Sequence, residues 1–352
     1  MQTIHVQASR SYDVLIGEGL LPKAGEKLAE VISPCRAVIV SDDNVFALYG
    51  ETLRKSLQDA GFEPMEFVFP HGESSKNLSV YGELLETMCA ARITRSDCIV
   101  ALGGGVVGDL AGFAAATYQR GIAFAQIPTS LLAAVDSSVG GKTAVDLPSG
   151  KNQVGCFYQP SVVLCDTDTF KTLPEAEYRN GCAEIIKYAM IGSSELFAAL
   201  EEKPVSEQYE AVVSRCVSMK RDFVEQDEFD RGLRMMLNFG HTFGHAVESC
   251  SQFAIAHGQA VAMGMAAITE SAVKRGFCEE GTLEKLTELL KSYHLNAKIP
   301  YPAQELFLAA GSDKKSSGGS INLIVPQKIG CCTIEKIKKE ELLGWLQDGG
   351  IQ

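Results

Sequence analysis

No run of about 18 or more apolar residues occurs in the 352-residue sequence, which excludes a transmembrane helix. The opening residues, MQTIHVQASRSYDVLIGEG, lack the basic and then apolar layout of a signal peptide and instead alternate as a strand does. The eleven cysteines include no CxxC pair. Because free thiols explain this odd, scattered set better than a disulfide framework, we expect a protein of the reducing cytoplasm.

Positive charge is also scarce: 32 Lys and Arg stand against 44 Asp and Glu, which gives a formal net charge of −12. A surface this acidic argues against nucleic acid or an anionic membrane as the main partner. A small anionic substrate stays possible, because a buried pocket can be locally basic. With 46% hydrophobic residues and a mean hydropathy of +0.04, the composition is that of a globular protein, and the length suggests two domains.

The two halves of the sequence differ in pattern. Apolar strand-like runs, spaced by helical patterns, fill the first half: AVIVSD (37–42), FEPMEFVFP (62–70), DCIVALGGG (97–105), AFAQIPTS (123–130) and SVVLCDTDTF (161–170). Such runs predict a mostly parallel, Rossmann-like sheet buried on both faces. After about Leu173 long helical patterns dominate, and only SINLIVPQ (320–327) resembles a strand, which fits a small hairpin. We therefore predict an α/β domain over 1–172 and an all-helical domain over 173–352.

A glycine cluster follows the third of these runs: Gly103, Gly104, Gly105 and Gly108, then Asp109. The spacing matches the dinucleotide fingerprint, in which bare backbone lets a pyrophosphate approach the start of a helix. It departs from the Rossmann pattern because it does not follow the first strand and no ribose-binding acid stands about twenty residues later. A tight turn that needs small residues is the alternative, and three consecutive glycines favour the phosphate site.

The stretch from Val135 to Thr143, VDSSVGGKT, contains Asp136 and Lys142, and Lys151-Asn152 follows. Gly-Gly-Lys-Thr resembles part of a P-loop, but the upstream glycine is missing. Two lysines, an acid and an amide in a loop-rich segment suggest binding of a polar anion. A solvated loop accounts for the composition equally well.

Three of the six histidines fall within seventeen residues, His241, His245 and His257. The first two, at i and i+4, share one helix face. Upstream, Glu184 and Lys187 lie one turn apart in an otherwise apolar helical pattern, where buried charges need a partner or a metal. Two histidines and a glutamate would leave one position open on zinc, as in catalytic sites. Core histidines with a helical ion pair are the alternative reading, and spacing alone favours the metal only slightly.

Several blocks together resemble the 3-dehydroquinate synthase family. They are GGGVVGDLAGFAAATYQRGI (103–122), PTSLLAAVDSSVGGKTAVDLPSGKNQVGCFYQP (128–160), LPEAEYRNGCAEIIKYAMI (173–191), GLRMMLNFGHTFGHAVE (232–248) and HGQAVAMGM (257–265), with weaker matches at 41–45, 71–76 and 313–315. The resemblance implies an NAD-binding α/β domain followed by a helical metal domain. It also implies conversion of 3-deoxy-D-arabino-heptulosonate 7-phosphate to 3-dehydroquinate and phosphate, with NAD⁺ reduced and reoxidised within one turnover.

The same resemblance assigns roles to individual residues of this sequence. It implies Zn²⁺ or Co²⁺ held by Glu184, His241 and His257, with His245 in proton transfer. Further catalytic positions would be Lys142, Asp230, Arg234 and Asn238, and substrate-binding positions Arg120, Asp136, Asn152, Lys187, Lys220, Lys314 and Lys315. Arg120 would reach the substrate phosphate across a homodimer interface.

For NAD the implied contacts come from several separate segments of the first half of the sequence. They are Asp42 and Asn44; Glu73, Ser74, Ser75 and Lys76; Gly104, Gly105, Val106, Val107, Gly108 and Asp109; Thr129, Ser130, Lys142 and Lys151; and Thr169, Phe170, Lys171 and Thr172.

Four positions depart from the family pattern: His71, Ser130, Gln259 and Asp230, the last standing where the family usually has Glu. Related sugar-phosphate cyclases that act on sedoheptulose 7-phosphate are the nearest alternative, and the presence of His245 favours 3-dehydroquinate synthase. Iron-type polyol dehydrogenases lack the VDSSVGGKTAV and NFGHTFGH blocks. A non-catalytic homologue is disfavoured because every charged position that the chemistry needs is filled.

Overall fold

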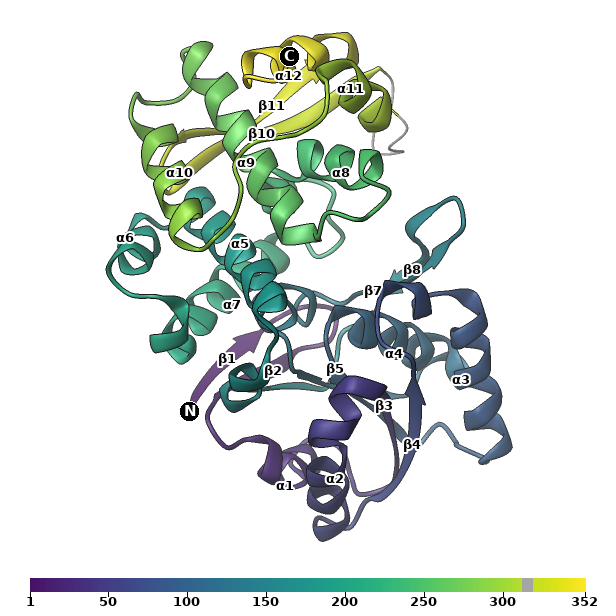
Figure 1. The fold of residues 1–352 in the computed structure, drawn as a ribbon. Helices are drawn as coiled ribbons and strands as arrows, with labels where there is room; N and C mark the ends of the chain where they lie inside the picture. The colour runs from purple at the N-terminus through teal and green to yellow at the C-terminus, as the bar shows by residue number, and fades with distance from the viewer. Residues whose placement is uncertain (312–318) are drawn as a thin grey trace. The chain divides into compact units, whose positions relative to one another are not determined.

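The computed structural model describes residues 1–311 and 319–352, which form two compact units (Figure 1). The first unit consists of residues 1–174 and 209–229, and the second of residues 175–208 and 230–352. A single boundary after residue 172 does not describe this division. Residues 209–229 fold with the first unit because helix α7 (Tyr209–Gln226) packs against strands β1 (Gln2–Val6) and β2 (Tyr12–Gly17).

A seven-stranded sheet forms the centre of the first unit, in the order β1-β2-β9-β6-β5-β3-β4. Its other strands are β3 (Arg36–Asp42), β4 (Glu63–Phe69), β5 (Cys98–Gly103), β6 (Ala123–Pro128) and β9 (Val162–Asp166). β1 and β2 pair antiparallel and all other pairs are parallel, which confirms the predicted mostly parallel sheet. The chain moves from β3 outward to β4 and then back past β3 to β5, so the sheet has a topological switch point between β3 and β5.

Helices cover both faces of this sheet. They are α1 (Ala24–Ala29), α2 (Asp43–Asp59), α3 (Leu78–Ala90), α4 (Gly105–Thr117) and α7, with short turns at Leu21–Lys23, Glu73–Ser75, Tyr118–Arg120, Ala133–Ser137 and Thr167–Thr172. Ile39 of β3 packs in one core with Leu53 of α2, whereas Val38 and Val40 pack in another with Leu110 of α4. Alternate residues of one strand therefore fill two cores, which explains the continuous apolar runs in the sequence.

One segment differs from its prediction. The loop-rich segment predicted around residues 135–152 contains most of an antiparallel hairpin, β7 (Lys142–Leu147) and β8 (Gly150–Phe157). Val145 pairs with Val154 across it. The glycines, serines and proline of this stretch are turn-forming residues, and they conceal a short alternating pattern whose Val145 is fully buried.

The second unit is mainly helical. Its helices are α5 (Glu175–Gly192), α6 (Ser194–Glu202), α8 (His241–Cys250), α9 (His257–Lys274), α10 (Thr282–Ser292), α11 (Ala303–Gly311) and α12 (Leu342–Asp348), with short turns at Val205–Glu207, Leu233–Asn238 and Lys339–Glu341. It is not all-helical, because β10 (Ser320–Lys328) and β11 (Cys331–Lys338) form a hairpin that includes the strand expected at 320–327.

Helices α8 and α9 cross with their backbones almost in contact. A Cβ added at Gly264 of α9 would lie 2.0 Å from the carbonyl oxygen of Gly240, the residue before α8. A Cβ added at Gly244 of α8 would lie 3.0 Å from the carbonyl oxygen of Ala260. Gly240 itself has φ +77°, a left-handed conformation that favours glycine. These glycines bring the first residue of α8 close to α9.

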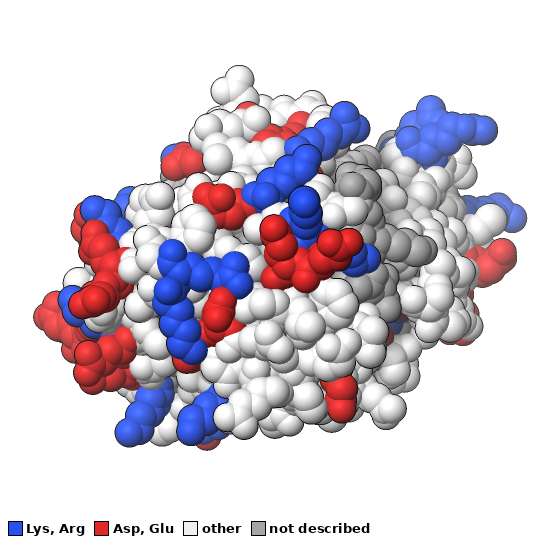
Figure 2. Space-filling view, turned by 90° about the horizontal axis from the view of Figure 1, so that it is seen from above, with Lys and Arg blue, Asp and Glu red and all other residues white. Residues whose placement is uncertain are grey.

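Charged groups of both signs are mixed on the face drawn in Figure 2, where Lys and Arg lie among Asp and Glu. On that face they do not merge into one extended basic field. Within the described residues, no helix combines the length and apolar character that crossing a bilayer requires.

Candidate active site

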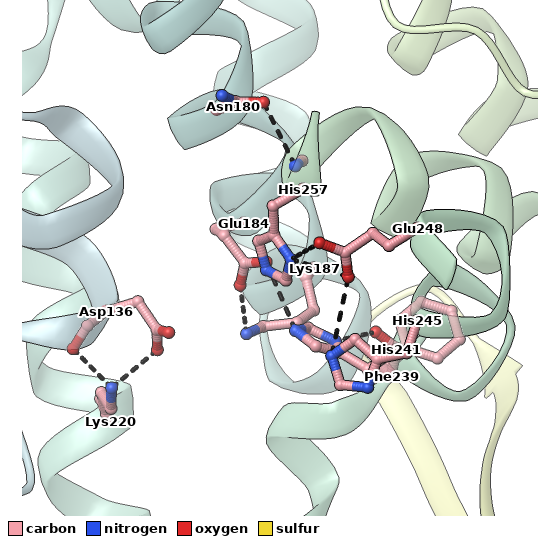
Figure 3. A network of polar contacts seen from close by, with 11 residues as sticks. Asp136, Asn180, Glu184, Lys187, Lys220, Phe239, His241, His245, Glu248 and His257 are labelled. Atoms are coloured by element: carbon pink, nitrogen blue, oxygen red, sulfur yellow. Dashed lines mark hydrogen bonds and ion pairs between the residues drawn. The ribbon is translucent and has the colours of Figure 1, made fainter. Parts of the chain in front are cut away.

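The second unit brings together the carboxylate and the two imidazoles that the sequence singled out as metal ligands (Figure 3). Glu184 lies in the buried middle of α5, whereas His241 and His257 are the first residues of α8 and α9. Glu184 Oε1 is 3.6 Å from His241 Nε2 and 3.4 Å from His257 Nε2. Three separate helices thus direct one ligand atom each to a common point.

Each histidine is oriented through its other ring nitrogen. The Nδ1 of His241 is 3.1 Å from the carbonyl oxygen of Phe239, and the Nδ1 of His257 is 3.4 Å from a carboxylate oxygen of Glu248. The start of α9 is itself fixed on α5, since the Gly258 amide donates to Asn180 Oδ1 at 3.2 Å. In both rings Nε2 is therefore the nitrogen that faces Glu184.

The electrostatic environment of the two rings differs. Burial lowers the pKa of His241 well below its usual range, which outweighs the attraction of Glu184. Burial also acts to lower the pKa of His257, but hydrogen bonds to Glu184 and Glu248 outweigh it and raise this pKa to about 10. Two carboxylates on either side of one imidazole attract positive charge, and a cation bound at Nε2 replaces a proton there.

The donor set fits a divalent zinc or cobalt ion. Bonds of about 2.0–2.1 Å place the ligands of tetrahedral zinc about 3.3 Å apart, close to the two Glu184 distances. The three ligand atoms all lie within 4.8 Å of one another. Imidazole nitrogen and carboxylate oxygen suit zinc and cobalt, and three protein ligands leave a coordination position for substrate.

Two further polar side chains lie beside this cluster, and two other predicted residues lie elsewhere in the same unit. Lys187, one turn after Glu184 and 1% exposed, forms an ion pair with it. The ring of His245 lies 5.4 Å from that of His241 and 6.2 Å from that of His257, measured between centroids. Arg234 is 1% exposed in the turn that ends at Asn238, and Asp230, at φ +55°, precedes that turn.

A second group of predicted residues lies at one edge of the sheet in the first unit. Asp42 ends β3, where its Oδ1 accepts from the Val45 amide at 2.9 Å and caps α2. Gly103 ends β5, Gly104 precedes α4, and the Thr129 amide after β6 donates to the Gly103 carbonyl at 3.0 Å. The segments after three neighbouring parallel strands thus meet at the switch point, where open α/β sheets bind their ligands.

Two of the predicted lysines of this unit, Lys76 and Lys151, have acidic or amide partners. Lys76 Nζ donates to Asp109 Oδ2 at 2.5 Å and to Asn152 Oδ1 at 2.6 Å. Burial opposes its charge, but Asp109 outweighs burial and raises the pKa of Lys76. Lys151 lies 3.7 Å from Glu73.

Three further predicted groups occupy the same unit. Lys220 of α7 donates to Asp136 Oδ1 at 2.7 Å (Figure 3). The turn that contains residues 169–172 is held to α2 by the Tyr49 hydroxyl, which donates to the Thr169 carbonyl. Lys142 is exposed at the start of β7.

Two predicted residues, Lys314 and Lys315, lie outside the described residues. Sequence reasoning assigned no role to Glu248 or Asn180, although both contact the start of α9. Glu248 stands three residues after His245, so its place on the same helix face could have indicated it. The contact of Asn180 depends on how α5 and α9 pack and leaves no trace in local spacing.

Comparison with known families and sequences gives one consistent result. Family models described as 3-dehydroquinate synthase N-terminal and C-terminal match residues 66–180 and 181–316. The chain is 44% identical to the 3-dehydroquinate synthase of Clostridium acetobutylicum over 354 residues, 99% of each chain. It is 45% identical to that of Enterococcus faecalis over 350 residues, 97% of this chain and 98% of the relative.

Solved structures extend the comparison. A 2-epi-5-epi-valiolone synthase from Streptomyces hygroscopicus with NAD⁺ and Zn²⁺ bound matches with a TM-score of 0.88 at 29% identity over 99% of each chain. A 2-deoxy-scyllo-inosose synthase complexed with carbaglucose-6-phosphate, NAD⁺ and Co²⁺ matches with a TM-score of 0.87 at 25% identity, over 99% of this chain and all of the other. An iron-containing alcohol dehydrogenase, at a TM-score of 0.64 and 15% identity over 99% of each chain, shares the fold alone.

Proposed function

The chain belongs to the 3-dehydroquinate synthase family, and from this premise we propose that it converts 3-deoxy-D-arabino-heptulosonate 7-phosphate to 3-dehydroquinate and phosphate. The reaction is a lyase reaction: phosphate leaves by β-elimination, and an intramolecular aldol addition closes the carbocycle. The observation that carries the proposal is the carboxylate of Glu184 between the Nε2 atoms of His241 and His257. These three residues hold the metal in the proposal.

When bound, the metal polarises the substrate oxygen as a Lewis acid, and NAD⁺ accepts and returns one hydride. The chain contributes binding and proton transfer. Lys187 and Arg234 in the second unit are cations 1% exposed each, suited to the carboxylate and phosphate of the substrate. His245, beside His241 on α8 and partly exposed, moves the proton.

The first unit supplies the NAD site in this proposal. Gly104 contributes no side chain before α4, so the amides at the start of that helix can accept a pyrophosphate. Asp42 lies across the switch point on β3 and offers a carboxylate to ribose hydroxyls. The ion pair between the buried Lys76 and the partly buried Asp109 fixes the loop after β4 against α4.

The activity is tested by measuring phosphate release from 3-deoxy-D-arabino-heptulosonate 7-phosphate with NAD⁺ and zinc, while following absorbance of NADH. We expect phosphate release with no accumulation of NADH, because the hydride returns within each turnover. A sample without NAD⁺ and a sample treated with chelator serve as controls.

A parallel sample contains sedoheptulose 7-phosphate, since the valiolone synthase with a TM-score of 0.88 makes a related cyclase the second candidate. Turnover of that substrate alone would replace the proposed substrate and keep the cofactors. Phosphate release from neither compound, by protein with metal and NAD⁺ bound, would refute catalysis.

We include in the proposal a homodimer in which Arg120 acts on the neighbouring site, in a reducing compartment that keeps the eleven free thiols reduced. Arg120 is exposed just after the last turn of α4. A helix of thirteen residues is about 20 Å long, so this side chain lies far from the start of α4 in its own chain.

Complementation of two inactive variants tests this arrangement. Arg120→Ala and His245→Ala should each be inactive, and after subunit exchange the mixture should regain about a quarter of wild-type activity, because half of the dimers carry one intact site. Each variant exchanged with itself is the control. No recovery in a mixture proven to contain heterodimers would place Arg120 in its own chain's site.

A further inference from the structure

Glu248 makes contacts that the proposed reaction has not used. It lies on α8, 6% exposed, three residues after His245 and seven after His241. Its two carboxylate oxygens are each 3.4 Å from the Nδ1 of His257, and one is 4.0 Å from the Nε2 of His245 (Figure 3). A nearly buried carboxylate thus faces a metal-ligand candidate from the side opposite Glu184.

The ring of His257 lies between two carboxylates. Its Nε2 is 3.4 Å from Glu184 Oε1, and its Nδ1 faces Glu248. A neutral imidazole carries a proton on one nitrogen and a lone pair on the other. When Nδ1–H donates to Glu248, the lone pair is on Nε2 and points to the position where the three ligand atoms converge.

We propose that Glu248 is a positioning residue that fixes the rotation and tautomer of His257 for metal binding. The inference rests on the proposed metal site. His241 offers an internal parallel, because its Nδ1 faces the Phe239 carbonyl and its Nε2 also faces Glu184. A backbone atom orients His241 and a side chain orients His257. Only the orienting side chain, Glu248, can be removed by substitution. Such partners typically change metal affinity 10–100-fold when they are removed.

The structure also offers a competing arrangement. His245, Glu248 and His257 could together hold a cation, since one ligand atom from each lies within 4.8 Å of the others. That site would use the Nδ1 of His257, while the first site uses its Nε2. Both nitrogens can bind metal only if the ring loses its last proton. If both sites are filled, the chain binds two ions, whereas the first site alone binds one.

Zinc affinity measured by competition with a chromophoric chelator tests the proposal, together with the zinc content per chain and the visible spectrum of the cobalt-loaded protein. For Glu248→Ala we expect zinc binding 10–100-fold weaker and a changed cobalt spectrum. For Glu248→Gln we expect a smaller loss, about 10-fold or less, because the amide oxygen still accepts from Nδ1–H. The wild-type protein should bind one zinc ion per chain.

Glu270→Ala and Glu270→Gln are the matched controls. Glu270 lies on α9, thirteen residues after His257, and pairs with Lys274 at 2.8 Å. Its removal takes a carboxylate from the helix that carries His257, and it should leave zinc affinity and the cobalt spectrum unchanged. Thermal melting of each metal-free variant tests whether it is folded, and Glu248→Gln carries the test if Glu248→Ala does not fold.

Each remaining outcome decides against the inference. Wild-type zinc affinity and an unchanged cobalt spectrum in the folded Glu248 variants would overturn it while the metal site stands. Two zinc ions in the wild-type protein, one of them lost in both Glu248 variants, would assign Glu248 to a second site as a ligand. A wild-type protein that binds no zinc would instead refute the proposed function on which the inference rests.

Discussion

The variant His241→Ala is expected to lose bound metal and catalytic turnover together. In the proposed site its imidazole supplies one of three ligand atoms, beside those of Glu184 and His257, and a site left with these two residues has too few protein ligands to retain zinc at low concentration. We expect zinc content, measured by elemental analysis after gel filtration, to fall from one per chain to near zero. Phosphate release should fall at least about 1,000-fold, to background, because the Lewis acid is gone.

The matched control is His5→Ala, which removes an exposed imidazole that pairs with Asp13 on the neighbouring strand. That variant should keep its zinc and its turnover. NAD⁺ binding by His241→Ala should persist, since the proposed NAD contacts lie in the first unit. Full zinc content in purified His241→Ala would show that His241 is not a ligand.

The sequence predicts the central sheet well because its strands are buried on both faces. β3, β5 and β6 end at an acid, a glycine cluster and a proline, and the predicted runs contain β5 and β6 and all of β3 except its first residue, Arg36. The hairpin β7–β8 was missed because a partly exposed hairpin leaves a weak pattern among turn-forming residues. The placement of α7 depends on which surface its buried face contacts, and periodicity alone does not specify a partner.

In the site, contacts within one helix could be predicted from the spacing of residues in the sequence, whereas contacts between helices could not. Glu184 and Lys187 one turn apart, and His241 and His245 at i and i+4, follow from helical geometry, and the structure shows each pair in contact. The orientation of His257 by Glu248 depends on where α9 crosses α8. Glycines that contact the backbone of the facing helix set that crossing. A single sequence does not reveal which glycines make such contacts.

Substitution of one of these glycines, Gly264→Ala, is expected to destabilise the protein and weaken metal binding at once. The added Cβ would lie 2.0 Å from the Gly240 carbonyl oxygen and 2.9 Å from the Gly244 amide nitrogen, both backbone atoms of the α8 segment. Helix α8 must therefore move away from α9. We expect the free energy of unfolding, measured with urea, to fall by about 3 kcal/mol, the upper end of the usual cost of overpacking.

Metal affinity should fall with stability because His241 directly follows Gly240 in the chain. A displacement of α8 that relieves the clash moves the His241 ring away from Glu184 Oε1, from which its Nε2 is now 3.6 Å distant. We therefore expect zinc binding to be at least about 10-fold weaker in the folded variant, with cobalt absorbance as a second readout of ligand geometry.

Gly82→Ala provides the opposite control. Gly82 also lies within a helix, α3, but a Cβ added there meets nothing within 4 Å. The substitution should raise the free energy of unfolding by about 0.5–1 kcal/mol, because alanine favours the helix over glycine, and should leave zinc affinity unchanged. Wild-type stability in Gly264→Ala would show that the crossing accepts the added Cβ without cost. Wild-type zinc affinity would show that His241 keeps its position when it does so. The loss expected instead would identify the close crossing of α8 and α9 as what holds the two histidines at a common metal.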